Sequence, residues 1–308
     1  MGCAGPCSKL GWVKNAGTPL PLGVVTVTYS PGQHLPALVE SLSANTEIIL
    51  ADNGSTDGSP QAVAEAYDNV HFLPTGGNIG YGAAANRGIA ELARMRADGL
   101  IRGDVVLLVN PDVTFAEGAI DALLECASAN PDAGSVGPLI RENDGSVYPS
   151  ARAVPTLIGG TGHAVLSGVW PNNPFSRRYH GDSAMDRQRD AGWLSGSCLL
   201  LNWAAFDEIG GFDERYFMYM EDVDLGDRLG RAGWRNIFCP AAEIHHDQGH
   251  SAKKFKARTI RAHHESAYRF NADRAPGWRW APLRWGLRAG LALRASILLG
   301  LARRRNEL

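Results

Sequence analysis

A run of acidic residues between Phe217 and Gly233 is the strongest candidate for acid–base chemistry. Wound as an α-helix at about 100° per residue, this segment separates its acids onto two faces. One face carries two favourable acid–base pairs four residues apart and is predicted to be solvated surface. These pairs are Asp224–Arg228 and Asp227–Arg231. Asp222 falls on the opposite, apolar face, level with Leu225, where a carboxylate is unfavourable unless it interacts with a partner or a substrate. We interpret Asp222 as a candidate catalytic base; the alternative is an acid that complements the helix dipole.

A metal site is the second candidate. Asn110–Pro111–Asp112 ends an apolar run, so Asp112 is expected at the edge of a sheet with oxygens free for a hard divalent cation. The alternative is an N-cap for a helix predicted over residues 115–130. His245 and His246 follow the last predicted strand and point to opposite faces, so at most one of them enters the cleft. Their spacing is not that of a zinc finger or a zinc protease.

Two glycine-containing turns could hold a nucleotide. Asp52 ends a strand and could accept from a ribose hydroxyl or a base, although Asp52–Asn53–Gly54 is also an ordinary turn sequence. The turn over residues 76–80 could present backbone N–H groups to phosphate at the start of the next helix. It lacks both the dinucleotide-binding spacing and the Lys-Ser/Thr pair of a P-loop.

The segment from Gly192 to Cys198 places small residues beside one large aromatic. Trp193 could form a stacking wall for a sugar, or the segment could be a turn before a buried strand. Gly196–Ser197 does not fit the nucleophile elbow of serine hydrolases, which disfavours that class.

Alternating strands and helices are predicted to position these residues. Strands are predicted over residues 23–30, 46–52, 70–73 and 104–110, with helices over 35–43, 60–67 and 81–96 between them. Four such repeats predict an open, doubly wound α/β sheet, whose ligands bind beyond the carboxyl ends of its strands. Further strands are predicted over residues 134–140, 193–201 and 236–245. The long stretch 149–189 is predicted to be irregular.

Composition and charge bound the class of protein. The 308 residues are 44% apolar, enough for one large core, and the net charge of −2 hides an uneven distribution. Residues 252–308 hold 14 Lys and Arg against 3 acids. Five dispersed cysteines indicate a reducing compartment. Residues 1–22 are interpreted as a loose leader without the features of a signal peptide. No run is expected to span a bilayer, so the chain is predicted to be cytosolic or peripheral on the cytosolic face of the plasma membrane.

Taken together, these segments resemble the family 2 inverting glycosyltransferases of the GT-A fold over residues 23–273. The motifs that carry the resemblance are Val27–Ser30, Asp52–Gly58, Gly77–Gly82 with Asn86, Asn110–Asp112, Gly192–Ser197, Glu221–Asp224 and His246–Ser251. A closer resemblance, to enzymes that transfer rhamnose to lipid-linked GlcNAc, is carried by Ser146–Arg152, Trp170–Pro174 and Phe212–Leu229. The resemblance implies a nucleotide-sugar half over residues 23–133, an acceptor half over 134–273 and a basic helical tail over 274–308.

The resemblance also implies a role for each matching position. The donor is expected at Thr28, Tyr29, Asp52, Asn78, Asn110 and Asp112; Mn²⁺ or Mg²⁺ at Asp112 and His246; the acceptor at Trp193, Ser195, Gly196 and Glu221; and the base at Asp222. Many members have Asp-x-Asp where this chain has Asn110–Pro111–Asp112, so Asp112 alone would supply that carboxylate.

The implied reaction is a single in-line displacement that inverts the anomeric centre. Its donor would be dTDP-β-L-rhamnose and its acceptor polyprenyl-diphospho-GlcNAc, giving the α-L-rhamnosyl-(1,3)-GlcNAc linker of arabinogalactan. Other nucleotide sugars, a nucleotidyltransferase and a non-catalytic nucleotide-sugar-binding module are the alternatives. A homo-oligomer is left open.

The basic tail alternates aromatic and cationic residues. Trp278, Trp280 and Trp285 lie among arginines such as Arg284 and Arg288, a pattern that can rest on an anionic bilayer surface. Nucleic-acid binding is the rival for any basic tail, but no recognised DNA- or RNA-binding module accompanies it, and we expect no nucleic-acid partner. The remaining alternative is a solvated helix that packs on the body.

Overall fold

The computed structural model describes residues 22–42, 45–101, 103–156, 185–247 and 256–304. The predicted leader before residue 22, most of the predicted irregular stretch, and the motif residues Trp170–Pro174, Gly249 and Ser251 lie outside these ranges.

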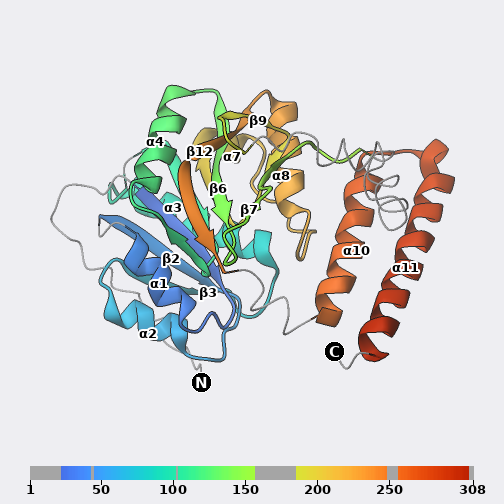
Figure 1. Cartoon of the computed structure of the whole chain (residues 1–308), viewed down its shortest axis with the longest axis horizontal. Coiled ribbons are helices and arrows are strands. Elements are labelled where there is room, and N and C mark those ends of the chain that lie inside the picture. Colours follow the sequence, from blue (N-terminus) through green and yellow to red (C-terminus); the bar gives the residue numbers. More distant parts are fainter. Residues whose placement is uncertain (1–21, 43–44, 102, 157–184, 248–255, 305–308) are drawn as a thin grey trace, which may run out of the picture.

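The described strands form one large mixed sheet and a small two-stranded one (Figure 1). Along the large sheet the order is β3-β2-β1-β4-β11-β6-β12-β5, with β7 beside β6 and β9 beside β12; β8 pairs with β10. The strands are β1 (Leu22–Thr28), β2 (Thr46–Asp52), β3 (Val70–Pro74), β4 (Val105–Val109), β5 (Val113–Phe115), β6 (Ala133–Arg141), β7 (Val147–Tyr148), β8 (Ala151–Arg152), β9 (Arg189–Ala191), β10 (Trp193–Leu194), β11 (Cys198–Asn202) and β12 (Arg235–His246).

The first half of the sheet is parallel, as predicted. β1 lies between β2 and β4, parallel to both, and Thr28 is in register with Asp52. β11 runs antiparallel to β4, with Cys198 opposite Val109, so the loop before β11 returns to the edge where β1, β2 and β4 end. The predicted α/β fold is therefore confirmed, and one edge of the sheet collects the strand ends that carry the candidate residues.

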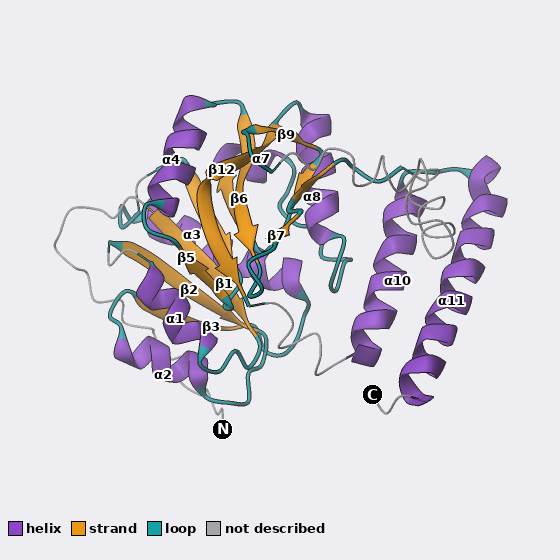
Figure 2. Ribbon diagram, viewed as in Figure 1, coloured by secondary structure: helices purple, strands orange, loops and turns teal. Residues whose placement is uncertain are grey.

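Helices cover both faces of the sheet (Figure 2). The helices are α1 (His34–Ser41), α2 (Ser59–Ala66), α3 (Tyr81–Ala97), α4 (Ala119–Ala129), α7 (Trp203–Glu208), α8 (Glu221–Ala232), α10 (Lys256–Asp273), the 3₁₀ turn η1 (Trp278–Trp280) and α11 (Ala281–Arg304). Residues of α1, α2 and α4 share one core cluster with one face of the sheet, and residues of α3, α7 and α8 share a second with the other. Val24 and Val25 on β1 enter the first and the second cluster respectively, as strand alternation requires.

Three predicted elements differ in the structure. The helix predicted from residue 115 is the short strand β5 followed by α4, whose N-cap is Gly118, so the N-cap alternative for Asp112 is wrong. The strand predicted over 193–201 is interrupted at residues 195–197, between β10 and β11. The helix predicted from Phe217 begins only at Glu221, because Tyr219 and Met220 adopt a left-handed backbone with φ of 67°.

The face of α8 predicted to be solvated is covered at Asp224, Asp227 and Arg228, and exposed only at Arg231. Asp224 is only 6% exposed, and its carboxylate accepts a hydrogen bond from Arg228 at 2.6 Å. Arg274, directly after α10, lies 3.9 Å from the same carboxylate. The prediction of a solvated face is wrong because periodicity shows which residues share a face, and not what packs against it.

The C-terminal helices α10 and α11 form an antiparallel pair beside the body (Figures 1 and 2). Between Trp278 and Arg304 the chain is, by length and composition alone, long and apolar enough to cross a membrane, and only 6% of the most apolar window is buried. By this measure, the expectation that no run could span a bilayer is wrong. It was based on uninterrupted apolar residues, whereas the mean hydropathy of the segment stays high despite its scattered arginines.

Candidate active site

Asp222 lies in the first turn of α8, at the edge of the sheet where the strands end. Its Oδ2 accepts a hydrogen bond from the Gly196 N–H at 3.1 Å, and Oδ1 accepts one from the Val223 N–H at 2.8 Å. Burial raises the pKa of Asp222, and these two backbone donors oppose the rise. A Cβ added at Gly196 would lie 3.3 Å from the Asp222 Cβ, so a residue without a side chain suits this approach. Asp222 is thus a carboxylate with a raised proton affinity, as a general base requires.

Glu221 lies beside Asp222 and is more deeply buried. Its side chain is 8% exposed overall, and its Oε2 has no hydrogen-bond partner among the described residues. Burial, and then the charge of Asp222, raise the pKa of Glu221 to about 8. Both adjacent acids therefore have raised pKa values, and that of Glu221 lies close to neutral pH.

Tyr81 connects this pair to the other side of the site and was missed by the sequence analysis. Its hydroxyl donates to the Gly196 carbonyl oxygen at 2.8 Å. Burial and the charges of Glu221, Asp222 and Asp112, among others, raise its pKa well above the usual range, which places all three acids around one phenol. The signal in the sequence was its position, directly after the predicted Gly76–Gly80 turn.

Asp112 and His246 meet as predicted. The Asp112 Oδ1 and the His246 Nε2 are 3.1 Å apart, and the Asp247 N–H donates to the Asp112 carbonyl oxygen. His246 is buried, and its Nδ1 has no partner among the described residues. His245 faces the other way and is exposed, so only one of the two histidines reaches the site.

A carboxylate and an imidazole on one site can serve as two ligands of a divalent cation. The described residues contain no group of three or more acids, histidines or cysteines that could hold a metal by themselves. Two protein ligands still fit Mg²⁺ or Mn²⁺, because such ions often complete their shell with substrate phosphates and water.

Asp52 is held in a turn at the end of β2. Its carboxylate accepts hydrogen bonds from the Thr28 hydroxyl at 2.8 Å, from the Ser55 hydroxyl and from the backbone N–H groups of Gly54 and Ser55. Asp52 is 4% exposed, so a nucleotide that binds it must replace one of these partners. The structure thus places Thr28 and Asp52 together, in the turn role that was the alternative for Asp52.

The turn after β3 joins this region to Tyr81. The Thr75 hydroxyl contacts the Asp52 carbonyl oxygen at 2.8 Å and the Asn53 side chain at 3.0 Å. The Asn53 amide donates to the Gly80 carbonyl oxygen at 3.1 Å. Asp52 is thereby linked through Asn53, Gly80 and Tyr81 to Gly196 and Asp222.

Three predicted donor residues border the same edge. Tyr29 follows β1 and is half-buried. The Asn78 side-chain oxygen accepts from the Gly80 N–H at 3.3 Å, within its own turn. The Asn110 N–H donates to the Ser197 carbonyl oxygen at 2.9 Å, which fixes the end of β4 against the loop before β11.

The predicted acceptor residues divide into two kinds. Gly196 lies between Tyr81 and Asp222, at the site itself. Trp193 is 7% exposed and packs over Gly226, where a Cβ would come within 2.7 Å of it. Ser195 is also buried, beside Ser197. The burial of Trp193 favours the alternative, a turn before a buried strand, over a wall open to a sugar.

Known families and relatives match most of the chain. Residues 23–180 match the description "Glycosyl transferase family 2", and residues 174–291 match "Glycosyl transferase family group 2". The chain is 54% identical over 292 residues to an "N-acetylglucosaminyl-diphospho-decaprenol L-rhamnosyltransferase" of Mycobacterium tuberculosis, covering 93% of this chain and 95% of that one. This chain belongs to glycosyl transferase family 2.

More distant relatives agree. The "Rhamnosyltransferase WbbL" of Escherichia coli is 27% identical, with 81% of this chain and 92% of that one covered. Among solved structures, a mannosyltransferase from Pyrobaculum calidifontis in complex with GDP-Man and Mn²⁺ aligns with a TM-score of 0.53 at 16% identity, over 94% of this chain and 76% of that one. This likeness supports the predicted GT-A type of fold.

In a family 2 glycosyltransferase, the arrangement provides two of the requirements of glycosyl transfer. A half-buried carboxylate with a raised pKa can take a proton from an acceptor hydroxyl. The Asp112–His246 pair could hold a cation that receives the charge of the leaving diphosphate. A separate hollow beside α8, bordered by Asp190, Gly226 and Arg235, contains none of the predicted site residues.

Proposed function

We propose that this chain transfers L-rhamnose from dTDP-β-L-rhamnose to the GlcNAc of polyprenyl-diphospho-GlcNAc, with inversion, forming an α-L-rhamnosyl-(1,3)-GlcNAc linker for arabinogalactan assembly. The observation that carries the proposal is the position of Asp222, hydrogen-bonded to the N–H of Gly196, whose carbonyl oxygen Tyr81 contacts, in a chain 54% identical to an "N-acetylglucosaminyl-diphospho-decaprenol L-rhamnosyltransferase".

Asp222 acts as the base. It removes the proton of the acceptor hydroxyl as that oxygen attacks the anomeric carbon of the donor, and the bond from that carbon to the diphosphate breaks. One displacement from the side opposite the leaving group inverts the anomeric centre, so no second nucleophilic carboxylate is needed. Glu221, whose pKa burial raises to about 8, can in its protonated form donate a hydrogen bond to the acceptor.

The donor binds at the edge of the sheet where β1, β2 and β4 end. Thr28, Tyr29, Asp52, Asn78 and Asn110 border the nucleotide, and Asp112 with His246 would hold the divalent cation. When bound, Mn²⁺ or Mg²⁺ supplies positive charge to the departing diphosphate. On the acceptor side, Gly196 and Glu221 lie next to Asp222 and contact the acceptor. Trp193 and Ser195 are buried and pack behind them.

The enzyme works at a membrane surface, on the cytoplasmic face, where a polyprenyl-linked acceptor is anchored. Between Trp278 and Arg304 there is no acidic residue. The exposed side chains of this segment include three tryptophans and several aliphatic residues. They are Trp278, Trp280, Leu283, Trp285, Leu293, Ile297 and Leu301. Exposed apolar side chains among arginines favour insertion into an anionic interface.

The test is the substitution Asp222→Asn, assayed with radiolabelled dTDP-rhamnose and polyprenyl-diphospho-GlcNAc. Loss of the base should reduce turnover by about 10²- to 10⁴-fold while dTDP binding survives. Asp121→Asn is a matched control, because Asp121 is also an acid in the first turn of a helix, α4, but is exposed. If Asp222→Asn turned over at the wild-type rate, Asp222 would only complement the helix dipole.

A panel of nucleotide sugars in the same assay tests the donor. Transfer from GDP-mannose or UDP-galactofuranose, with none from dTDP-rhamnose, would leave the family unchanged and overturn the proposed donor.

A further inference from the structure

The loop directly before α8 has an unusual backbone. Tyr219 and Met220 both have a φ of 67°, a conformation that residues with a side chain rarely adopt, and here two such residues are consecutive. Met220 is also the N-cap of α8, and its carbonyl oxygen accepts from the Asp224 N–H at 2.8 Å. The strained pair is therefore part of the same turn that presents Glu221 and Asp222. Such backbone strain persists only where the surroundings impose it.

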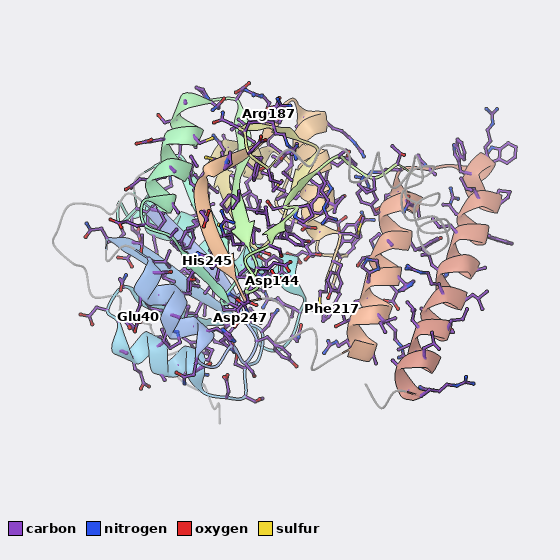
Figure 3. The ribbon with its side chains drawn as sticks, in the orientation of Figure 1. Glu40, Asp144, Arg187, Phe217, His245 and Asp247 are labelled. Atoms are coloured by element: carbon purple, nitrogen blue, oxygen red, sulfur yellow. The ribbon has the colours of Figure 1, made fainter. Side chains whose placement is uncertain are left out.

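One side of this loop is held by α10. The Ser266 hydroxyl donates to the Met218 carbonyl oxygen at 2.9 Å. The rings of Tyr219 and His263 are 5.6 Å apart in an edge-to-face arrangement. Phe217 lies between the body and α10 in Figure 3, with the Arg258 guanidinium 4.5 Å from its ring centroid. Ser266 is buried, so its hydrogen bond is shielded from water.

The other side of the loop is held by the donor half of the site. The Tyr81 N–H donates to the Phe217 carbonyl oxygen at 3.0 Å, and Tyr81 carries the hydroxyl that contacts Gly196. Residues 217–220 are thus fixed between α10 and the start of α3. The loop cannot change its backbone without moving one of these two contacts.

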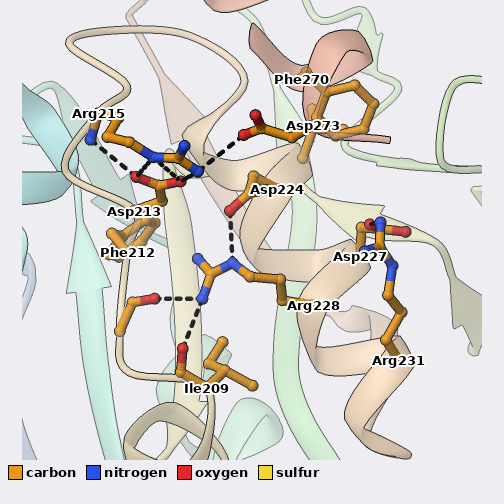
Figure 4. A network of polar contacts seen from close by, with 12 residues as sticks. Ile209, Phe212, Asp213, Arg215, Asp224, Asp227, Arg228, Arg231, Phe270 and Asp273 are labelled. Carbon is orange, nitrogen blue, oxygen red and sulfur yellow. Dashed lines mark hydrogen bonds and ion pairs between the residues drawn. The ribbon is translucent and has the colours of Figure 1, made fainter. Parts of the chain in front are cut away.

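A buried joint anchors α10 itself to α8. Phe270 of α10 is fully buried and clusters with Trp193, Tyr216 and Val223. Arg274, just after α10, pairs with Asp227 of α8. Figure 4 shows the neighbouring contacts, in which Arg215 bridges Asp213 and Asp273. The α10 helix is therefore firmly placed relative to α8, and can impose a conformation on the loop between them.

We propose that α10 positions Asp222, and that Ser266 is the main positioning residue, acting through the Met218 carbonyl on the left-handed pair Tyr219–Met220. Without this contact the pair relaxes toward a right-handed backbone, the first turn of α8 shifts, and the Asp222 carboxylate leaves the Gly196 N–H. This inference rests on the proposed role of Asp222 as the base. The same contact connects the C-terminal helices, which carry the exposed tryptophans, to the loop that positions Asp222.

The first experiment compares Ser266→Ala with Ser296→Ala. Both serines donate to a backbone carbonyl at 2.9 Å, but Ser296 bonds within α11, on an exposed surface. We expect kcat of Ser266→Ala to fall about tenfold with an unchanged KM for dTDP-rhamnose, since small displacements of a reacting group lower rates steeply. Ser296→Ala should behave as the wild type. An equal kcat in the two variants would overturn the proposal, as would a fall in kcat accompanied by an equal loss of dTDP binding.

A second experiment separates positioning from general stability. Glycine adopts a φ of 67° without strain, so Met220→Gly should relieve the strain at one of the two residues and make the loop conformation less dependent on Ser266. In the Met220→Gly background, the Ser266→Ala substitution should lower kcat by less than about twofold. If the two substitutions instead multiplied their effects, Ser266 would not act through the strained pair.

Two further variants keep the outcome decisive. Arg258 is exposed, so Arg258→Ala removes a contact to Phe217 without disturbing a core. We expect it to lower kcat severalfold. It takes the place of Ser266→Ala if that variant is too unstable to assay. Asp222→Asn is assayed beside them. Loss of activity in Asp222→Asn together with wild-type kcat in Ser266→Ala and Arg258→Ala refutes the positioning role alone. Full activity in Asp222→Asn refutes the base itself.

Discussion

Replacing Glu221 by glutamine should remove a dependence of stability on pH that the wild-type fold carries. Glu221 is 8% exposed, and its Oε2 has no hydrogen-bond partner among the described residues. Burial, with the charge of Asp222 second, raises its pKa from 4.5 to about 8. The folded chain therefore binds the proton of Glu221 more tightly than the unfolded chain does.

The sign follows from this difference. The contribution of Glu221 to stability is fully present below pH 4.5 and is lost as the pH rises through about 8. At about 1.4 kcal/mol for each tenfold change in proton affinity, raising the pH from about 5 to about 7.5 lowers the free energy of unfolding by on the order of 3 kcal/mol. Glutamine has nearly the same shape and no proton to lose, so Glu221→Gln should lack this dependence.

The assay is urea unfolding followed by tryptophan fluorescence, at several pH values between about 5 and 7.5. We expect Glu221→Gln to gain on the wild type as the pH rises. Glu125→Gln is the control, because Glu125 is exposed on α4 and the substitution there removes no burial. A difference between Glu221→Gln and the wild type that stays constant with pH would refute the reasoning. Since glutamine resembles the protonated acid, turnover at neutral pH should fall less than in Asp222→Asn.

Three more outcomes follow from the structure. Asp112→Asn should weaken Mn²⁺-dependent dTDP binding by at least about tenfold in calorimetry, and EDTA should stop wild-type turnover; full activity in chelator would exclude the proposed cation. Gly80→Ala should destabilise the fold by about 2–4 kcal/mol in urea unfolding, because its φ is 97° and its Cβ would lie 2.6 Å from a backbone carbonyl oxygen. At Gly76 the φ is 83° and nothing lies within 4 Å of an added Cβ, so Gly76→Ala should lower the free energy of unfolding by only about 1–2 kcal/mol. Equal losses in the two variants would show that the chain relieves the clash at residue 80. Trp285→Ser should lower co-sedimentation with anionic vesicles about tenfold, since this ring is 77% exposed; unchanged sedimentation would argue against insertion of this face.

Much of the donor half could be read from the chain itself. The predicted strand over residues 46–52 has the same bounds in the structure, and the predicted starts of β3 and α3 also agree. These elements are set by local features, namely runs of β-branched residues and the glycines that end them. Because parallel strands end at one edge, the closeness of Thr28 and Asp52 and the meeting of Asp112 with His246 could also be anticipated.

The α8 region shows where local patterns stop being sufficient. A helical pattern extends back to Phe217, yet the helix begins at Glu221 because α10 and Tyr81 hold the preceding residues in a left-handed backbone. The sequence leaves Trp193 open as a sugar wall or as part of a turn before a buried strand, and Gly226 of α8, which lies against it, favours the second. Nothing within a few residues of either position encodes these contacts.

The sequence by itself determined the family, which polar residues follow each strand, and which acid could act as the base. Only the tertiary structure decided how strongly burial raises the pKa of Glu221, how much of the polar face of α8 is covered, and that a helix some forty residues further along the chain contacts the loop before the base. The reason is physical: residue spacing fixes the direction in which a side chain leaves its own element, whereas desolvation and strain depend on what distant segments bring against it.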